Sequence, residues 1–255
     1  MIKSYLVSAE EGDQNSQCTL GSLYESGYPR QSDDGGFHEL GFVGANKGKS
    51  FYWYQKAADQ GHMEAQYALG RHYDDERSTI YSSEIAFRWF LSSAKQNQMD
   101  AQFKVATMLQ EGKGVQKNKA EAIQWLKSAA NLGHKEAQYS LGCQYDVGSY
   151  LTKSDERAAQ WYLLAAAQNH IKAQYKIACM YESGIGVTQS STKAVHWLKK
   201  IVGKGHKDAQ YKLGTMYELG LGINQSNKHA LKWYFRAAEQ GQKLAAEKVK
   251  SLNNR

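Results

Sequence analysis

The sequence contains a single proline, Pro29, among its 255 residues. Proline breaks helices, so its near absence leaves most of the chain free to be helical. No apolar run approaches the roughly 18 residues of a transmembrane helix, and the N-terminus has too short an apolar core for a secretory signal. We expect a helical, cytoplasmic protein without membrane insertion, or an exported one if the N-terminus has been trimmed.

Neither half of the sequence has balanced charge. Residues 1–100 contain 9 Lys and Arg against 14 Asp and Glu, a net charge of −5. Residues 101–255 contain 23 against 11, a net charge of +12. A basic surface of this kind attracts acidic partners. Binding to an acidic protein surface is a simpler explanation of the basic half than binding to nucleic acid.

A period of 36 residues dominates the sequence. All six tryptophans lie on it, and an Ala-Gln pair recurs with the same spacing. A fixed period between 20 and 50 residues is typical of a repeat architecture. The tryptophans are Trp53, Trp89, Trp125, Trp161, Trp197 and Trp233, and the pairs begin at Ala65, Ala101, Ala137, Ala173 and Ala209.

Each repeat is predicted to form two helices. Counted from the alanine of the pair as position 0, small or apolar residues occupy positions 0, 4, 5 and 8, on one helical face. A glycine then ends the first helix in most repeats. Neither helix is long enough to be stable alone, so the pairs must stack on their neighbours. The second helix is expected to begin at an N-cap residue, which is Asn46, Ser82, Asn118, Ser154, Ser190 or Ser226.

Position 5 is always small: glycine in four repeats and alanine (Ala106, Ala178) in two. Glycine lowers helix stability, so its presence indicates close approach by the partner helix. We expect the tryptophan of the second helix to fill that space. Trp161 should therefore be a core residue whose removal is strongly destabilising.

The pattern AQxxLGxxYxxGxGV followed by AxxWxxxAAxxGH resembles the Sel-one-like repeat, a relative of the tetratricopeptide repeat. Gln138, Tyr145, Trp161 and Ala165-Ala166 occupy its positions. The resemblance implies an all-α, α/α superhelical solenoid that lacks enzymatic activity and cofactors and serves as a scaffold or adaptor for other proteins.

The period divides the chain into parts of a single repeat domain, residues 1–255. The N-terminus matches the end of a second helix, so a partial repeat comes first. The predicted parts are 1–15 (partial N-terminal helix), 16–64 (repeat 1), 65–100 (repeat 2), 101–136 (repeat 3), 137–172 (repeat 4), 173–208 (repeat 5), 209–244 (repeat 6) and 245–255 (C-terminal cap helix).

Repeat 1 contains an insertion at residues 28–45. One interpretation is a tolerated surface loop. The other is a loop that grips a partner, since long loops within compact units are often functional. In that case Phe37, His38 and Phe42 are the predicted contact residues.

The three cysteines favour a reducing compartment. Secreted members of the family that use disulfides carry a cysteine pair in each repeat, whereas this chain has only Cys18, Cys143 and Cys179. Cys143 and Cys179 share one register in adjacent repeats, roughly 10 Å apart between packed helices, which is too far for a disulfide. We expect both to be free, reactive thiols.

Other chemistry is poorly supported. Ser92 and Ser190 begin Ser-x-x-Lys motifs, but the SDN and KTG elements of penicillin-binding enzymes are missing. Residues 44–50 are one residue short of a phosphate-binding loop, and aromatic residues on the repeat period belong to the core rather than to a base-stacking surface. Histidines that recur once per repeat are too far apart to share a metal, namely His62, His134, His170 and His206.

The remaining candidate is the face of the first helices opposite the core, at positions 3, 6 and 10, which should line the concave side. Lysines recur at position 3, so we expect a basic strip that contacts an acidic partner protein and tolerates polar exchange with little effect on folding. The predicted partner-binding residues are Arg71, Lys104, Thr107, Glu111, Cys143, Lys176, Cys179, Lys212 and Thr215.

The sequence thus predicts a non-enzymatic module that binds a partner protein or peptide, without metal, cofactor, small-molecule substrate or nucleic acid. One alternative is an immunity or inhibitor protein that neutralises a toxin or effector. An alternative from another class is a β-lactam-handling hydrolase.

Overall fold

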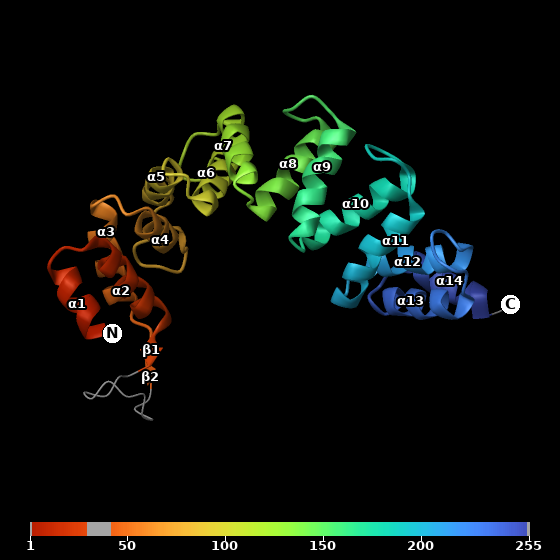
Figure 1. The fold of residues 1–255 in the computed structure, drawn as a ribbon, viewed down its shortest axis with the longest axis horizontal. Helices are drawn as coiled ribbons and strands as arrows, with labels where there is room; N and C mark the ends of the chain where they lie inside the picture. Colours follow the sequence, from red (N-terminus) through yellow and green to blue (C-terminus); the bar gives the residue numbers. More distant parts are fainter. Residues whose placement is uncertain (1, 30–41, 254–255) are drawn as a thin grey trace. The chain divides into compact units, whose positions relative to one another are not determined.

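The computed structural model describes residues 2–29 and 42–253, which form fourteen α-helices (Figure 1). The predicted all-α repeat fold is confirmed. The first helices of the repeats are α2 (Gln14–Ser26), α4 (Met63–Asp74), α6 (Met99–Glu111), α8 (Lys135–Val147), α10 (Ile171–Ser183), α12 (Lys207–Leu219) and α14 (Lys243–Asn253). The second helices are α1 (Ile2–Glu10), α3 (Lys47–Asp59), α5 (Ser83–Ala94), α7 (Lys119–Asn131), α9 (Asp155–Ala167), α11 (Ser191–Ile201) and α13 (Asn227–Glu239), and a 3₁₀ turn, η1 (Val202–Lys204), follows α11.

A small sheet, which the sequence did not predict, forms at the base of the insertion. Strand β1 (Tyr28–Pro29) pairs antiparallel with β2 (Phe42–Val43), with Tyr28 opposite Val43. Pro29 is tolerated because a two-residue strand has few ladder hydrogen bonds to lose. The predicted contact residues Phe37 and His38 lie outside the described residues.

The chain consists of two compact units, residues 1–129 and 130–255. Each helix packs mainly on its neighbours in sequence. In the first unit, α1 packs on α2, α2 on α3, α3 on α4, α4 on α5 and α5 on α6. In the second, consecutive helices from α8 to α14 pack in the same way. This is the contact pattern of stacked helical hairpins.

The predicted helix ends are confirmed. All six predicted N-cap side chains accept a hydrogen bond from the backbone N–H three residues later. Gly112, Gly148, Gly184 and Gly220 end α6, α8, α10 and α12 in the left-handed conformation. Local sequence therefore determines where these helices start and stop.

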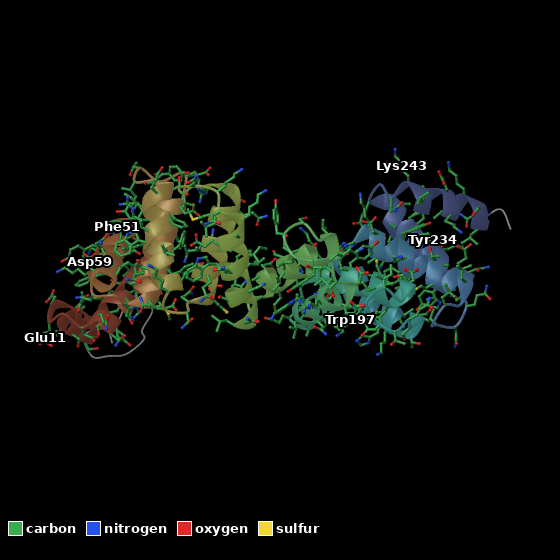
Figure 2. The ribbon with its side chains drawn as sticks, turned by 90° about the horizontal axis from the view of Figure 1, so that it is seen from above. Glu11, Phe51, Asp59, Trp197, Tyr234 and Lys243 are labelled. Atoms are coloured by element: carbon green, nitrogen blue, oxygen red, sulfur yellow. The ribbon has the colours of Figure 1, made fainter. Side chains whose placement is uncertain are left out.

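The small residue at position 5 meets the residue after the tryptophan, so the expected tryptophan contact is wrong. A Cβ on Gly142 would lie 2.7 Å from the ring of Tyr162. Tyr162 is fully buried, whereas Trp161 is only partly buried. Figure 2 shows the equivalent Tyr234 among the C-terminal helices, while Lys243 points outward. Trp53 is buried, but the other five tryptophans are only partly buried and mark the flank of the core rather than its centre.

Size at the two facing positions is matched from repeat to repeat. The four glycines lie against an aromatic ring, in the pairs Gly21–Tyr54, Gly70–Phe90, Gly142–Tyr162 and Gly214–Tyr234. Where position 5 is Ala106 or Ala178, the position of the ring is occupied by a buried leucine, Leu126 or Leu198. The extra methyl of alanine is thus matched by a smaller partner, as close packing requires.

A buried glutamine at position 1 joins each repeat to the one before it. Within the second unit, Gln210 Nε2 donates to the Val202 carbonyl (2.9 Å), and Gln240 Nε2 donates to Gln210 Oε1 (2.7 Å). The Ala-Gln pair therefore serves two purposes. Alanine lets the helices approach, and glutamine satisfies a buried carbonyl at the end of the preceding second helix.

Candidate functional site

The predicted partner-binding residues lie on what we call the first-helix face, positions 3, 6, 9 and 10 of the first helices. Arg71 and Glu111 are exposed there, and the other seven predicted residues are partly buried. Partial burial arises because positions 3 and 6 contact side chains of neighbouring helices. The face is therefore less open than the sequence suggested.

Lysines at position 3 pair with carboxylates at position 9 of the preceding repeat, thirty residues earlier in the chain. The predicted basic strip is thus a ladder of opposite charges. We call this arrangement the lysine–carboxylate ladder. Its pairs are Lys104 with Asp74 (3.3 Å), Lys176 with Asp146 (2.9 Å), Lys212 with Glu182, and Lys248 with Glu218 (2.9 Å).

The buried aromatic residues of the second helices contact the ion pairs of the ladder, as Tyr162 shows. Tyr162 Oη donates to Asp146 Oδ2 at 3.1 Å, and Lys176 Nζ lies 6.0 Å from the centre of the Tyr162 ring. Burial alone lowers the pKa of the Lys176 ammonium. The hydrogen bond to Asp146 and its negative charge outweigh that effect, so the pKa lies above its ordinary value. The lysine is therefore held charged by the preceding repeat.

Position 6 completes the same network. Tyr234 Oη donates to Glu218 Oε2 (2.6 Å) and lies 3.1 Å from Thr215 Oγ1, and the Tyr162 hydroxyl lies 3.4 Å from Cys143 Sγ. Burial, followed by the neighbouring carboxylate, raises the pKa of Tyr234. Of these residues, Thr215 and Cys143 were predicted to contact a partner, and in the structure they also help to join the helices.

A signal for the ladder was present in the sequence. The carboxylate position is Gln110 in repeat 3, and the lysine position of repeat 4 is Ser140. Both charges are thus missing together. The acidic partners lie at position 9, whereas the residues predicted from the sequence lie at positions 3, 6 and 10.

The three cysteines are free thiols, as predicted, but all are partly buried. Burial, and secondarily Glu64, raises the pKa of Cys18 to about 11. Burial also raises the pKa of Cys179. Because the thiolate is the reactive form, both thiols should react slowly, and Cys179 should be less reactive than predicted from the sequence.

Position 10 is the most accessible part of the first-helix face. Val147 is 70% exposed and Leu219 is 58% exposed, both at the ends of first helices in the second unit. Glu111 occupies the same position in the first unit and is also exposed. Val147 and Leu219 thus offer accessible apolar contact area on this face.

A cavity of about 830 Å³ opens on the first-helix face of the first unit. We call it the repeat-2 cleft. It lies between α2, the start of α3, the end of α4, the loop that follows α4, and α6. Its main lining residues are Glu25, Lys47, Phe51, Arg71, His72, Asp75, Arg77, Ile80 and Lys104.

The repeat-2 cleft exists because repeat 2 lacks the glycine turn. In repeat 5, Gly184 and Gly186 have φ values of 74° and 69°, and a Cβ on Gly186 would lie 2.2 Å from the Asp155 carbonyl oxygen. That turn packs directly on the start of α9. Repeat 2 has Glu76 and Ser78 at the same positions, and such residues avoid a positive φ.

The loop of repeat 2 therefore follows another course. Helix α4 ends at Asp74, one residue early, and Asp75 is extended with φ −76° and ψ 103°. The space beside Lys47 and Gly48, at the start of α3, stays open as the cleft. A cavity at this position was not predicted from the sequence.

The recurring histidines are N-caps of the first helices. His62, His134, His170 and His206 each accept the backbone N–H three residues later through Nδ1. His170 also contacts Glu136 through Nε2 at 2.8 Å. Among the described residues, no group of three or more His, Cys, Asp or Glu side chains has a metal-binding arrangement.

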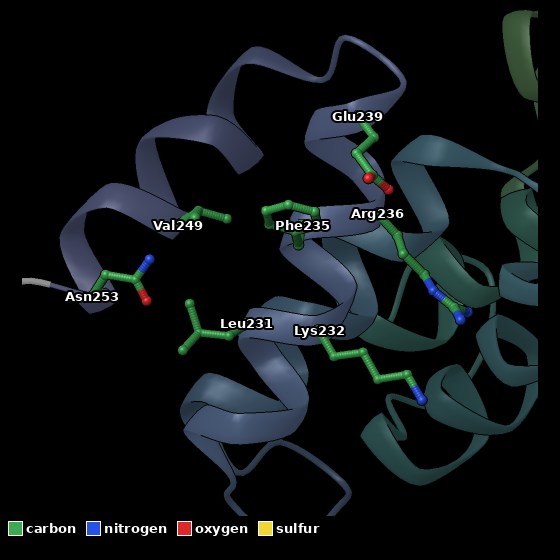
Figure 3. Close-up of a pocket in the computed structure, with 7 residues that line it drawn as sticks. All are labelled: Leu231, Lys232, Phe235, Arg236, Glu239, Val249 and Asn253. Atoms are coloured by element: carbon green, nitrogen blue, oxygen red, sulfur yellow. The ribbon is translucent and has the colours of Figure 1, made fainter.

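A second cavity, of about 430 Å³, lies between α13 and α14 (Figure 3). Phe235, Leu231 and Val249 line its apolar part, and Figure 3 shows Lys232 and Arg236 pointing away from Val249. None of the predicted site residues lies there. The Ser-x-x-Lys serines are also occupied: Ser92 Oγ donates to the Arg88 carbonyl (3.1 Å), and Ser190 caps α11.

Comparison with protein families decides the classification of the chain. The Sel1 repeat profile matches residues 16–62, 64–98, 100–134, 135–170, 171–206 and 207–242. The chain belongs to the Sel1 repeat family. Sel1 repeats are typically protein-interaction modules and are generally not catalytic. No curated protein sequence matches the chain.

Solved Sel1 repeat structures have the same fold. A Sel1 repeat protein from Oxalobacter formigenes is 30% identical, with a TM-score of 0.73 over 98% of this chain and 68% of that one. The protective antigen c5321 of uropathogenic Escherichia coli is 27% identical, with a TM-score of 0.82. The match to c5321 covers 98% of this chain but only 50% of c5321, so this chain spans about half the length of that protein.

More distant structures do not identify a partner. The immunity protein Pa5087 from Pseudomonas aeruginosa is 18% identical, with a TM-score of 0.46. The match covers 89% of this chain and 81% of Pa5087. A likeness at that level does not support a shared partner. None of the described helices has the length and apolar character needed to cross a membrane.

Proposed function

We propose that this Sel1 repeat protein is a non-enzymatic adaptor that binds a partner protein through its first-helix face. The proposal rests mainly on three exposed residues at position 10. Val147 and Leu219 directly follow the ladder carboxylates Asp146 and Glu218, and Glu111 occupies the same position in the first unit. The core positions of the same helices are fully used in packing. The accessible side chains of this face differ between repeats, which is the variation that a specific contact surface requires.

We further propose that the partner presents an acidic surface. The charge supporting this proposal is not the ladder as a whole, since each of its lysines already has a carboxylate. It is the greater exposure of two cations than of their own partners: the side chain of Arg71 is 52% exposed against 32% for Glu25, and that of Lys104 is 41% exposed against 15% for Asp74. An approaching partner therefore meets the ammonium before the carboxylate.

Site-specific photo-crosslinking in cells of the source organism tests this proposal. A photoreactive amino acid is placed at Glu111, Val147 or Leu219, and at Arg88 or Lys199 on second helices as matched exposed controls. We expect a partner protein to be captured from the first-helix positions and not from the controls. Equal capture from both sets would show that the second helices bind the partner.

The proposal treats the repeats, with the boundaries predicted from the sequence, as one binding domain in a reducing cytoplasm. The three free thiols support that location. A nitrocefin assay tests the absence of β-lactam hydrolysis. Turnover above the level of buffer would replace the adaptor proposal with the hydrolase.

A further inference from the structure

We propose that the repeat-2 cleft binds an acidic peptide segment of the partner protein. This inference rests on the proposed adaptor function and adds a specific site and ligand chemistry to it. The cleft results from the loss of the glycine turn in repeat 2, where other turns pack against the preceding second helix. Its volume of about 830 Å³ falls within the range of roughly 300–1,000 Å³ typical of ligand pockets.

The charges of the cleft are arranged with cations outward and carboxylates inward. The side chains of Arg71, Lys47 and Arg77 are 52%, 82% and 90% exposed, while those of Glu25 and Asp75 are 32% and 26% exposed. The mouth is thus positive although its acids and bases are nearly balanced in number. Such an arrangement attracts a carboxylate and repels a cation before contact.

The inner carboxylates keep partners when the cations turn toward a ligand. Glu25 accepts from Arg71 Nη2 (3.1 Å), but it also accepts from Tyr54 Oη (3.0 Å). Asp75 Oδ1 accepts both the side chain and the backbone N–H of Arg77, each at 3.1 Å. Arg71 and Arg77 can therefore reorient without leaving a partly buried carboxylate unsatisfied, which keeps the free-energy cost of binding low.

The inner wall favours a peptide over a free anion. The Phe51 ring meets the His72 ring edge-on, with centroids 6.1 Å apart, and Ile80 is 39% exposed at the loop. These apolar groups lie among the cations and would accommodate an apolar side chain between two acidic ones. A free inorganic anion would use only the cations and leave this surface in water.

Selection from a display library of random short peptides on the immobilised full chain tests the inference. We expect the selected peptides to be rich in Asp and Glu. Their affinity, measured by fluorescence anisotropy of labelled copies, should fall roughly tenfold in Arg71→Gln, as expected for loss of one charge-assisted contact. The control Arg88→Gln removes the same charge from an exposed position outside the cleft and should leave the affinity unchanged.

A loop graft tests the cavity itself. Residues 75–81 are replaced by the equally long sequence of residues 183–189, which restores both glycines and should close the cleft. We expect the graft to lose the selected peptides while keeping its helical circular dichroism. If the graft does not fold, Arg77→Gln takes its place and should weaken binding as Arg71→Gln does.

Three outcomes would overturn the inference: no enrichment of any peptide, enrichment without acidic residues, or equal binding by the grafted chain and the wild type. The adaptor function has a separate test. A partner captured by crosslinking at Val147 or Leu219 would uphold that function even if the repeat-2 cleft binds no peptide.

Discussion

Lys176 of α10 donates a 2.9 Å hydrogen bond to Asp146 of α8, in the first helix of the preceding repeat. Reversal of this lysine should therefore affect folding, contrary to the expectation from sequence. We predict that Lys176→Glu lowers the free energy of unfolding by about 1–2 kcal/mol, because it replaces a partly buried ion pair by two like charges. Urea denaturation measures the effect.

The control for this prediction is Lys172→Glu, which makes the same charge change at an exposed position in the first turn of α10. A carboxylate is favourable near a helix N-terminus, so this variant should be neutral or slightly more stable. Equal destabilisation by both variants would mean that net charge, rather than the ladder, is responsible.

A second prediction separates Tyr162 from Trp161. Tyr162→Ala should cost about 3–5 kcal/mol of unfolding free energy, the usual result of emptying a fully buried aromatic site. Trp161→Ala should cost less, because Trp161 is only partly buried. Urea melts of the two variants decide the order, and a larger loss for Trp161→Ala would restore the interpretation drawn from the sequence.

The match between position 5 and the facing ring leads to a third prediction. Gly142→Ala places a methyl 2.7 Å from the Tyr162 ring and should lower stability by about 1–3 kcal/mol. Tyr162→Leu in the same chain should remove that loss, since Ala178 with Leu198 is a natural pair of this kind. A double-mutant cycle measures the coupling, and additive effects would rule out direct contact.

A fourth prediction concerns the pH dependence at the repeat-2 cleft. Burial lowers the pKa of His72 below the ordinary value of 6.5; Arg71 and Lys47 act in the same direction, whereas Glu25 and Asp75 oppose it. The unfolded chain therefore binds a proton more readily than the folded chain. This contribution to stability is complete above about pH 6.5 and is lost as the pH falls below it.

His72→Met should make stability less dependent on pH between about 6.5 and 5, because methionine does not titrate. Methionine already occupies this position in Met108, Met180 and Met216, so the side chain suits the fold. Unfolding free energies at both pH values measure the change. The control is His196→Gln, at an exposed position, which should show the same pH dependence of stability as the wild type.

The sequence predicted features that depend on local chemistry. N-caps such as Ser190, terminal glycines such as Gly184, and the two-helix repeat all follow from residues close together in the chain. Contacts between residues far apart were harder to predict. Trp161 and Tyr162 are neighbours on α9, and only the way α9 packs against α8 determines which of them meets Gly142.

The candidate site was less predictable for the same reason. The lysines at position 3 were identified, but their partners lie thirty residues earlier, on another helix. The repeat-2 cleft depends on how a turn packs against the preceding repeat, a contact that Glu76 and Ser78 prevent. Periodicity locates a face, whereas the pairing across that face depends on how the helices stack.

A fifth prediction uses the buried glutamines at position 1. In the second unit, Gln138 and Gln210 accept a hydrogen bond through Oε1 from Gln168 and Gln240, each thirty residues later. Gln174 Oε1 is buried and has no hydrogen-bond partner among the residues that the structure describes. The residue thirty positions after Gln174 is Lys204. Lys204→Gln should therefore supply the missing donor and raise the free energy of unfolding by about 0.5–1.5 kcal/mol, the usual net contribution of one hydrogen bond.

Lys200→Gln is the matched control for this fifth prediction, because it removes the same charge from an exposed position four residues earlier. Urea denaturation of the two variants should show a gain only for Lys204→Gln. The gain should also disappear when Gln174→Ala is added, because the acceptor is then missing. A gain that persists in the double variant would show that it arises from removal of a positive charge beside η1 and not from the buried glutamine.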